Sequence, residues 1–456
     1  MPATIVDSAI FGNLFSTEAM RQVWSDENRT RKYLDIEAAL ARVQARLGII
    51  PAKAAAEIAR NCRLEKIDLR KLRAQTERIG YPVLGVVQQL VELCADDLGE
   101  WCHWGATTQD ITDTATVLQI REGLALIEDD LTAISAAMAE LARRHRDTPM
   151  IGRSNLQQAV PVTFGYKMAG LLSAIERHRA RLAELRPRVL MGEFAGAAGT
   201  LASLGQGGLE TQAGLMKELG LAQPVIAWHT LRDTIAEVGC FLGLVTGTLG
   251  KLAMDVKLMM QTEVGEVYEP FAHGRGSSST MPQKRNPISS CYIHACAGVV
   301  RQQVAALLDA MLADHERSTG PWEIEWIALP EAFLLSAGAL SQAKAVVGGL
   351  EVDAKRMRAN LDSTKGLVVS EAVMMGLAPH LGRERAHDLV YDLCREAIRQ
   401  DRPLLDLLSE NAAITQHVDR KKLSELCDPS NYLGLSGVMV DRVLERIRAA
   451  PLIKGV

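Results

Sequence analysis

The chain has 456 residues, of which 48% are hydrophobic and 23% are charged, and its formal net charge is −4. This composition is typical of a folded globular protein, and the near-neutral charge excludes a basic surface for nucleic acid or for an anionic membrane. Aromatic residues make up only 4%, so the composition favours helices over strands. A single hydrophobic core stops growing near roughly 250–300 residues, so two or three structural regions are expected.

The N-terminal segment and the cysteines bear on the compartment. Residues 1–15 lack a basic segment followed by a long apolar run, so they do not look like a secretory signal. The eight cysteines are scattered and form no CxxC pair, which indicates free thiols in a reducing cytoplasm. Cys291 and Cys296 lie close together, but no matching cluster completes a zinc site, so neither a metal nor another cofactor is expected.

Apolar residues recur at helical spacing along most of the chain. The first clear pattern predicts a helix over 28–47, which Gly48 and Pro51 would end. A long amphipathic helix is predicted over 124–145, where the basic residues at the end suit a helix C-terminus. Another helix is predicted over 162–187, with Pro187 as its stop.

The segment 232–266 is the most distinctive of the predicted helices. It contains no proline, and as one helix of about 35 residues it would be about 50 Å long. Its middle is apolar nearly all round, so it should be buried on every side. A membrane span is disfavoured because Glu237 and Lys251 bracket only 13 uncharged residues.

The last third of the chain continues the helical pattern over 288–314 and 330–350. Between them, Pro321 and Pro330 are expected to bound a non-helical stretch, and shorter helices follow in the tail. The sequence therefore predicts an all-α protein of three helical domains, which comprise residues 1–112, 113–352 and 353–456.

Residues 274–287 read GRGSSSTMPQKRNP and carry the strongest functional signal. A solvated glycine-rich loop is the plain alternative, but the SSxMxxKxNP spacing is far more specific. It resembles the signature of the fumarase/aspartase superfamily.

Two further segments fit the same superfamily. Residues 103–110, HWGATTQD, resemble its H-x-G-x-T-S-x-D segment, with Thr108 in place of the commoner serine. Residues 153–163, RSNLQQAVPVT, resemble its T-H-x-Q-x-A-x-P-x-T segment. Taken alone, the first would be an ordinary helix cap and the second a turn leading into a helix.

The resemblance covers nearly the whole chain and implies an elongated subunit with a long central helical bundle. It also implies a homotetramer whose active sites are each shared by three subunits, with a small polycarboxylate as substrate and no cofactor. In this resemblance Ser278 is the base that removes a proton from carbon, and Lys284 lowers its pKa and binds a carboxylate. The remaining residues that the resemblance places at the substrate are His103, Thr107, Thr108, Gln109, Asn155, Gln157, Met281, Asn286, Arg317 and Trp322. Arg317 among these, and His229 outside them, are weaker candidates.

Three departures argue against adenylosuccinate lyase within the superfamily. Asn155 stands where that lyase has its general-acid histidine, and residues 76–85 hold no counterpart of its early histidine. Trp322 and Trp326 stand about where its phosphate-binding serine and arginine would be, and indoles cannot replace a charged phosphate clamp. The pattern HERSxGxWxxEW at 315–326 instead resembles the bacterial 3-carboxy-cis,cis-muconate cycloisomerases.

The chemistry agrees with that placement. Run backwards, cycloisomerisation removes a proton next to one carboxylate and expels another carboxylate, whose reference pKa near ~4 lets it leave without a general acid. We therefore expect interconversion of 3-carboxy-cis,cis-muconate and 4-carboxymuconolactone through an aci-carboxylate. Two alternatives stay open, a C–N or related lyase that releases fumarate from a substituted succinate and a catalytically silent structural protein. Asn155 also departs from the tryptophan often found in the cycloisomerases, so other succinyl-type substrates with a good leaving group fit the same logic.

Overall fold

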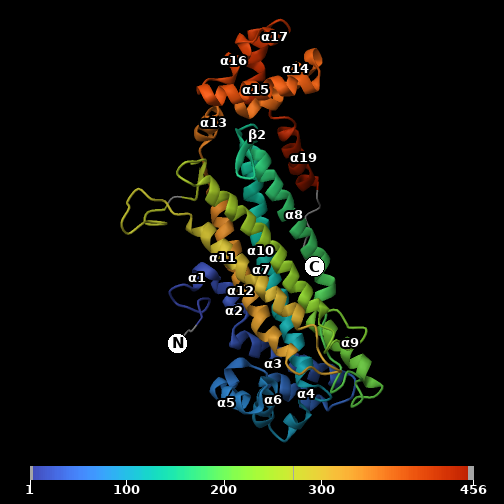
Figure 1. The fold of residues 1–456 in the computed structure, drawn as a ribbon. Coiled ribbons are helices and arrows are strands. Elements are labelled where there is room, and N and C mark those ends of the chain that lie inside the picture. The colour runs from blue at the N-terminus through green and yellow to red at the C-terminus, as the bar shows by residue number, and fades with distance from the viewer. Residues whose placement is uncertain (1–3, 271, 450–456) are drawn as a thin grey trace. The chain divides into compact units, whose positions relative to one another are not determined.

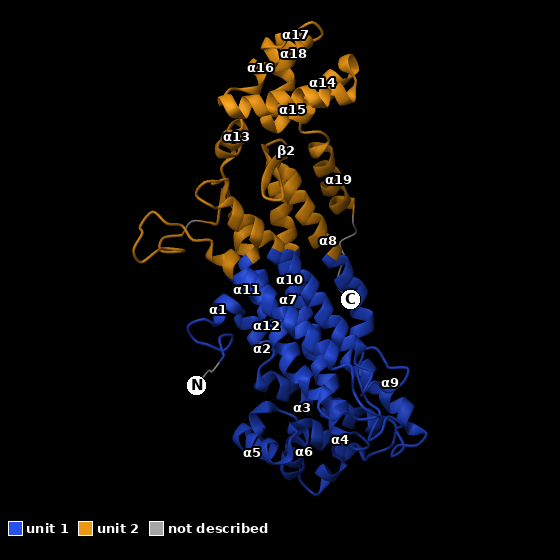
Figure 2. Cartoon of the chain, in the orientation of Figure 1, with its two compact units in different colours: residues 1–131, 178–250, 292–342 blue, residues 132–177, 251–291, 343–456 orange. Residues whose placement is uncertain are grey.

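The computed structural model describes residues 4–270 and 272–449, which are predominantly helical (Figure 1). The all-α prediction is confirmed. The chain divides into two compact units (Figure 2), and the division falls inside the long helices rather than between them. Unit 1 comprises residues 1–131, 178–250 and 292–342, and unit 2 comprises residues 132–177, 251–291 and 343–456. The three domains remain a prediction, and the boundary at 112 lies within a helix.

Unit 1 begins with short helices around one long helix, α3. The Ser25 side chain accepts the Asn28 N–H and caps α3, whose buried face includes Leu34 and Ala41. The helix ends just before Gly48, which has a φ of +71°. The predicted helix over 28–47 is thus confirmed. The elements of this region are α1 (Gly12–Phe15), α2 (Glu18–Val23), α3 (Asp26–Arg46), α4 (Ala52–Asn61), η1 (Leu64–Lys66), α5 (Leu69–Ile79), α6 (Pro82–Leu93) and η2 (Leu98–Trp101).

Five helices of more than 20 residues follow, with one shorter helix among them. They are α7 (Thr108–Arg144), α8 (Phe164–Val189), α9 (Gly207–Leu219), α10 (Asp233–Met259), α11 (Ile288–Asp309) and α12 (Pro321–Gly348). Helix α7 begins well before residue 124, because Asp110 and Asp113, which break the apolar pattern, are buried with polar partners. Helix α10 is shorter than predicted and ends at Met259. Helix α8 runs through Pro187 to Val189, so the predicted stop there is wrong.

The expected non-helical stretch between Pro321 and Pro330 is also wrong, because it forms the first turns of α12. Pro321 is the first residue of the helix, where its missing N–H has no partner to lose. Pro330 lies inside the helix and forgoes one backbone hydrogen bond. Its neighbours Leu329 and Phe333 are buried, and this packing holds the helix together across the proline.

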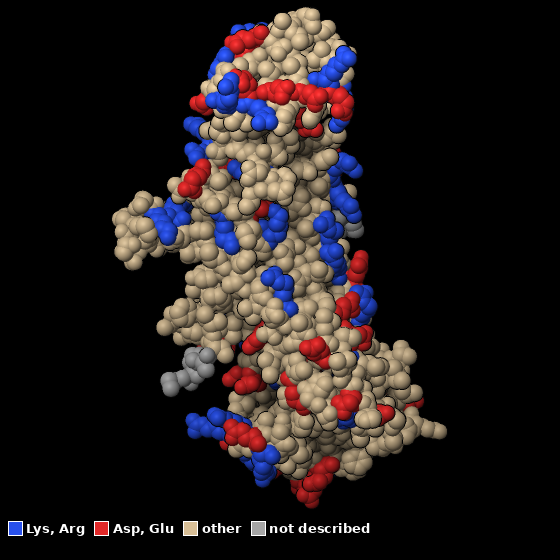
Figure 3. All heavy atoms as spheres, in the orientation of Figure 1, with Lys and Arg blue, Asp and Glu red and all other residues tan. Residues whose placement is uncertain are grey.

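Helices α10 and α12 are long and apolar enough to cross a membrane by length and composition. However, 56% of the apolar window of α10 and 67% of that of α12 is buried inside the protein. Burial of that extent is typical of helices in the core of a globular protein. Acidic and basic side chains are interspersed on the face drawn in Figure 3.

The β-hairpin between α7 and α8 was not predicted from the sequence. Strands β1 (Pro149–Ser154) and β2 (Gln157–Thr163) pair antiparallel, and Ser154 faces Gln157 across the turn. The two turn residues, Asn155 and Leu156, have φ values of +49° and +64°, as in a two-residue type I′ turn. Asn155 therefore stands at the tip of a rigid hairpin. A second, shorter pair joins β3 (Val267–Tyr268) to β4 (Glu351–Val352).

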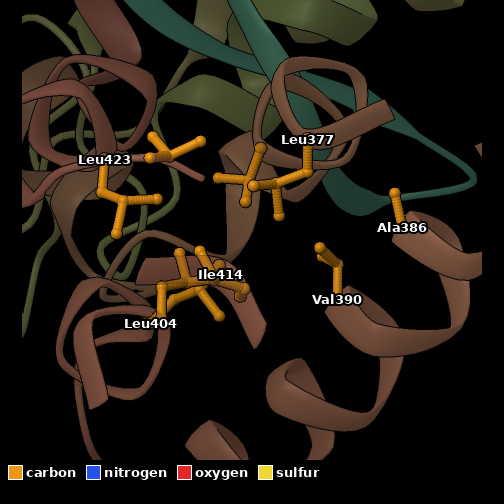
Figure 4. Close-up of a cluster of buried hydrophobic side chains, with 9 residues drawn as sticks. Leu377, Ala386, Val390, Leu404, Ile414 and Leu423 are labelled. Carbon is orange, nitrogen blue, oxygen red and sulfur yellow. The ribbon is translucent and has the colours of Figure 1, made fainter. Parts of the chain in front are cut away.

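The C-terminal part of unit 2 consists of short helices, as predicted for 353–456. They pack around a compact apolar cluster in which Leu377, Val390, Leu404, Ile414 and Leu423 point toward one another (Figure 4). The elements are α13 (Ala354–Asp362), η3 (Leu367–Val369), α14 (Ser370–Leu381), α15 (Arg383–Gln400), α16 (Leu404–Glu410), α17 (Ala412–Thr415), α18 (Arg420–Leu426), η4 (Pro429–Asn431) and α19 (Ser436–Ala449).

Candidate active site

The SSxMxxKxNP segment forms a long loop before α11 that extends away from the helices of unit 2 (Figure 2). Its base is closed by Asn286, whose backbone N–H and side-chain Nδ2 both donate to the Gly276 carbonyl, at 3.2 and 2.9 Å. The Asn286 amide thus holds the base of the loop together, and its contact with a substrate carboxylate stays a prediction. The loop is thus a preformed structure rather than a loose segment.

Within the loop, the Ser278 hydroxyl lies in a tight turn. Its Oγ accepts the backbone N–H groups of Thr280 at 3.3 Å and Met281 at 3.1 Å. Two N–H donors aimed at one oxygen stabilise negative charge on it. The Lys284 N–H closes the next turn onto the Met281 carbonyl at 3.1 Å, and both of these side chains are exposed. The turn therefore presents a hydroxyl suited to giving or taking a proton.

Gly276 provides a test of the loop geometry. Its φ is +69°, and a Cβ at this position would lie 2.7 Å from the Asn286 carbonyl oxygen. We expect Gly276→Ala to lower kcat by about tenfold or more, because the backbone at the loop base must shift. The melting temperature should stay within a few degrees of that of the wild type, since the loop is exposed. Steady-state kinetics and calorimetry check this. Gly274→Ala is the control, because its φ of +80° imposes the same left-handed strain on alanine but a Cβ there meets nothing within 4 Å. Equal kcat in both variants would contradict the expectation.

The end of the loop is anchored at the start of α11. Glu269 accepts the N–H groups of Ser289 at 3.1 Å and Ser290 at 2.7 Å, and so caps the helix. Arg285 donates to the Glu269 carbonyl at 2.9 Å and pairs with Glu351 at 3.0 Å. The loop that carries the SSxMxxKxNP segment thus has a fixed base and an exposed tip.

The hairpin carries the other site residues of unit 2. Asn155 and Gln157 are both exposed at its turn. Below them, Arg153 forms a bidentate pair with Glu266 at 2.9 and 2.8 Å, and Asn360 donates to the same buried carboxylate at 2.8 Å. Residues 149–163 include no histidine, so the hairpin offers an amide where the lyase motif has a general acid.

The HWGATTQD segment forms a turn in unit 1 that leads directly into α7. The Thr107 N–H donates to Asp110 Oδ2 at 2.9 Å, and Arg317 Nη1 donates to Thr107 Oγ1 at 3.0 Å. Thr108 is the first residue of α7, where unpaired N–H groups and the helix dipole favour an anion. A guanidinium, two hydroxyls and a helix N-terminus therefore meet at this turn, as carboxylate binding requires. We refer to residues 107–108 as the carboxylate turn.

His103 begins the same segment in a left-handed conformation, with a φ of +58°. Its Nδ1 lies 2.6 Å from Glu37 Oε1. Burial opposes the charged imidazolium, but Glu37, with a smaller effect of Asp110, raises the pKa of His103 above its ordinary value. The contact with Glu37 thus fixes the His103 ring beside the carboxylate turn.

Two of the expected substrate contacts point into the protein. The buried Gln109 amide donates to Asp113 Oδ2 at 3.1 Å and to the His229 carbonyl at 2.9 Å. The buried Trp322 donates its Nε1–H to Asp113 Oδ1 at 2.9 Å and stacks on Tyr81. Both side chains are used by the fold, so these two residues position the turn and α12 rather than face a ligand.

Sequence reasoning missed a buried ionic group beneath the turn. Arg232 donates to Asp113 at 2.7 and 3.1 Å and pairs with Glu325, and all three side chains are buried. The Arg232 guanidinium also lies over the Trp228 ring, 4.9 Å from its centroid. Isolated charges in a sequence do not reveal such pairing, because the partners Asp113 and Glu325 lie far from Arg232 along the chain.

Asp110 is the centre of a second buried group. Its two oxygens accept N–H groups of Thr107, Ala195 and Gly196, at 2.9 to 3.0 Å, and one lies 2.8 Å from His229 Nε2. Asp110, His229 and Glu193 have potential metal-ligating atoms within 4.8 Å of one another. Because both Asp110 oxygens already accept hydrogen bonds, the group is a hydrogen-bonded network that ties three segments of unit 1 together.

The predicted site residues are thus divided between the units of one chain. Unit 1 contains His103, Thr107, Thr108, Gln109, Arg317 and Trp322, and unit 2 contains Asn155, Gln157, Ser278, Met281, Lys284 and Asn286.

Comparisons with known proteins agree with these motifs. Residues 14–301 match the family model described as "Lyase", and residues 366–443 match "Adenylosuccinate lyase C-terminus". The chain is 59% identical over 445 residues to trans-aconitate decarboxylase 1 of Mycosarcoma maydis, covering 97% of this chain and 90% of that protein. It is 48% identical to 3-carboxy-cis,cis-muconate cycloisomerase of Pseudomonas aeruginosa, covering 95% of each. The crystal structure of the 3-carboxy-cis,cis-muconate lactonizing enzyme from Pseudomonas putida superposes with a TM-score of 0.92 at 42% identity, covering 97% of this chain and 99% of that one. The chain therefore belongs to the lyase family of the fumarase/aspartase superfamily.

Proposed function

We propose that the chain is an enzyme that decarboxylates trans-aconitate through an aci-carboxylate intermediate. The observation that carries the reaction type is Asn155, which stands at the hairpin tip in place of a general acid. A leaving group at this site has to depart without receiving a proton, and carbon dioxide does so. The choice of substrate is supported by the 59% identity to a trans-aconitate decarboxylase over nearly the whole chain.

The chemistry matches what the site offers. In trans-aconitate, the C–C bond to the carboxylate of the CH2 group breaks, and its electron pair forms a new C=C bond. The pair of the old double bond moves to the CH carbon, where the adjacent carboxylate takes up the charge as an aci-carboxylate. Protonation of that carbon gives the methylenesuccinate dianion. One trianion and one proton thus yield one dianion and carbon dioxide, and preorganised donors around the doubly charged group supply the main stabilisation.

Different residues deliver the proton, stabilise the charge and bind the second carboxylate. The Ser278 hydroxyl delivers the proton to carbon, and the N–H groups of Thr280 and Met281 stabilise the oxygen when it is left negative. Lys284 balances charge at the loop and restores the proton by relay. The carboxylate turn, with Arg317 and His103, holds a second carboxylate of the substrate.

We propose a homotetramer in which three subunits contribute to each active site. Large apolar side chains on the bundle helices support it, since Leu244 on α10 is 51% exposed, and Val299 and Leu308 on α11 are 45% and 47% exposed. Free cysteines at all eight positions support a cytoplasmic enzyme.

Cycloisomerisation of 3-carboxy-cis,cis-muconate, the reaction expected from the sequence, is the second candidate. It is favoured by the 48% identity to a cycloisomerase and by the TM-score of 0.92 to a lactonizing enzyme. Its carboxylate leaving group also needs no acid, and the proton again goes to a carbon next to a carboxylate. A lyase that expels an amine is disfavoured, because that leaving group needs the acid that Asn155 replaces.

Purified enzyme incubated separately with trans-aconitate, 3-carboxy-cis,cis-muconate and adenylosuccinate separates these reactions, with the organic products followed by proton NMR and the carbon dioxide trapped and measured. We expect methylenesuccinate and carbon dioxide in equal amounts from trans-aconitate. Turnover of carboxymuconate alone would replace the first candidate by the second. Fumarate from adenylosuccinate would overturn both, and no turnover or binding of any polycarboxylate would indicate a silent structural protein.

A further inference from the structure

Glu193 lies beneath the carboxylate turn and is fully buried. Its Oε2 accepts the Trp228 N–H at 2.6 Å, and its backbone N–H and carbonyl both bond to the Thr114 hydroxyl. In the described part of the chain, its Oε1 has no hydrogen-bond partner although it is buried. A buried carboxylate oxygen without a donor is costly, so the protonation state of Glu193 needs an explanation.

The neighbouring His229 accounts for the protonation state of Glu193. Asp110 Oδ1 accepts the Ala195 N–H and Oδ2 accepts those of Thr107 and Gly196, so Asp110 is the acceptor and His229 Nε2 the donor in their 2.8 Å contact. In the neutral imidazole, His229 Nδ1 is then an acceptor, and this buried atom also has no partner among the described residues. Asp110, Glu193 and His229 have potential ligating atoms within 4.8 Å of one another. Glu193 Oε1 and His229 Nδ1 are both acceptors without a donor, and a proton on Glu193 supplies a donor to this group.

We propose that Glu193 is in its acid form in the binding-competent enzyme, and that its ionisation weakens binding of the polycarboxylate at the carboxylate turn. This inference rests on the proposed function only in that the ligand is a polycarboxylate. Asp110 couples the two places, because it bonds both His229 and the Thr107 N–H. Ionised Glu193 would add a second buried negative charge beneath a turn that has to hold an anion.

The surroundings of Glu193 favour its acid form. Burial is the largest effect and raises the pKa of Glu193 to about 7, with Asp110 and Asp113 acting in the same direction and His229 and the Trp228 N–H against it. Burial lowers the pKa of the neighbouring His229, but Asp110 and Glu193 outweigh burial, so the pKa of His229 lies above its ordinary value.

The other charged groups packed here are neutralised within the protein. Arg232 follows His229 in the same segment, and its charge is matched by Asp113 on α7 and Glu325 on α12. Glu193, whose pKa is raised to about 7, and its neighbour His229, whose pKa is raised above its ordinary value, are thus the groups of this region that the ionic group of Arg232 does not neutralise.

Binding of tricarballylate, a saturated tricarboxylate with no bond that this chemistry breaks, tests the inference by calorimetry between pH 7 and 9. In the wild type we expect the Kd to rise by about fiftyfold over this range, since one proton on a group with a pKa of about 7 is linked to binding. Glu193→Gln carries a permanently neutral side chain, and its Kd should change by less than about threefold. In turnover measurements the same pH dependence should appear in KM rather than in kcat. The matched control is Glu237→Gln, which removes an exposed carboxylate paired with Arg188 and should follow the wild type.

Equal pH profiles for the three proteins would overturn the inference. If Glu193→Gln does not fold, the wild type alone still decides. Titrations near pH 8 in buffers of different ionisation enthalpy should show uptake of close to one proton per bound tricarballylate, and no uptake would overturn the proposal. Because tricarballylate is not turned over, these results are independent of whether trans-aconitate is the substrate. A wild type that binds tricarballylate but does not decarboxylate trans-aconitate would contradict only the proposed function.

Discussion

Replacing Ser278 with alanine should lower kcat by about a thousandfold or more. The hydroxyl is the group placed to carry the proton to or from carbon, and general acid–base catalysis contributes typically ~10²–10⁴-fold. Loss of the oxygen also removes the acceptor of the Thr280 and Met281 N–H groups, so stabilisation of charge is lost together with the proton. Stopped assays with trans-aconitate and carboxymuconate measure the effect, and binding of tricarballylate should weaken by less than about tenfold.

The control for this variant is the neighbouring serine. Ser279→Ala removes an exposed hydroxyl from the same loop and should keep kcat within about threefold of the wild type. A Ser278→Ala enzyme that retains more than about a tenth of the wild-type kcat would contradict the assigned role. The proton carrier would then have to be sought at Lys284, and Lys284→Met would show the larger loss.

The helices could be predicted from the sequence where their signals are local. Helix α3 has a capping serine and a glycine end, and the bundle helices have long apolar periodic runs. The start of α7 could not be found in this way, because Asp110 and Asp113 look like surface residues until their buried partners are known. The hairpin was missed because its type I′ turn is formed by Asn155 and Leu156, without the glycine that usually marks such a turn.

The site could be predicted in composition but not in orientation. The motif spacing indicated Ser278, Thr107 and Arg317, because functional loops keep their chemistry within a few residues. It could not show that Gln109 and Trp322 face inward, since that depends on Asp113 and on segments far away in the sequence. Glu193 was missed for the same reason, because a lone glutamate has no pattern and its meaning comes from His229 and Asp110 beside it.

The largest effect on stability is expected from breaking the buried ionic group of Arg232. Arg232→Met leaves Asp113 and Glu325 ionised, adjacent and without a counter-charge in the interior. Removing one partner of a buried pair costs about 3–5 kcal/mol, because the remaining charge has lost its solvation and its partner. Urea denaturation at fixed protein concentration should show this decrease in the free energy of unfolding. Activity should fall as well, since Asp113 also holds Trp322 and Gln109 beside the carboxylate turn.

Two comparisons make the Arg232 prediction specific. Arg188→Met removes an arginine whose partner, Glu237, is also exposed, and such pairs contribute about 0–1 kcal/mol, so its unfolding curve should stay close to that of the wild type. The triple variant Arg232→Met, Asp113→Asn, Glu325→Gln removes all three charges, and it should recover part of the lost stability because no uncompensated charge remains buried. If Arg232→Met and Arg188→Met destabilised the protein equally, the buried group would have no special role. If the triple variant were less stable than Arg232→Met alone, the loss would come from hydrogen bonding and packing rather than from unpaired charge.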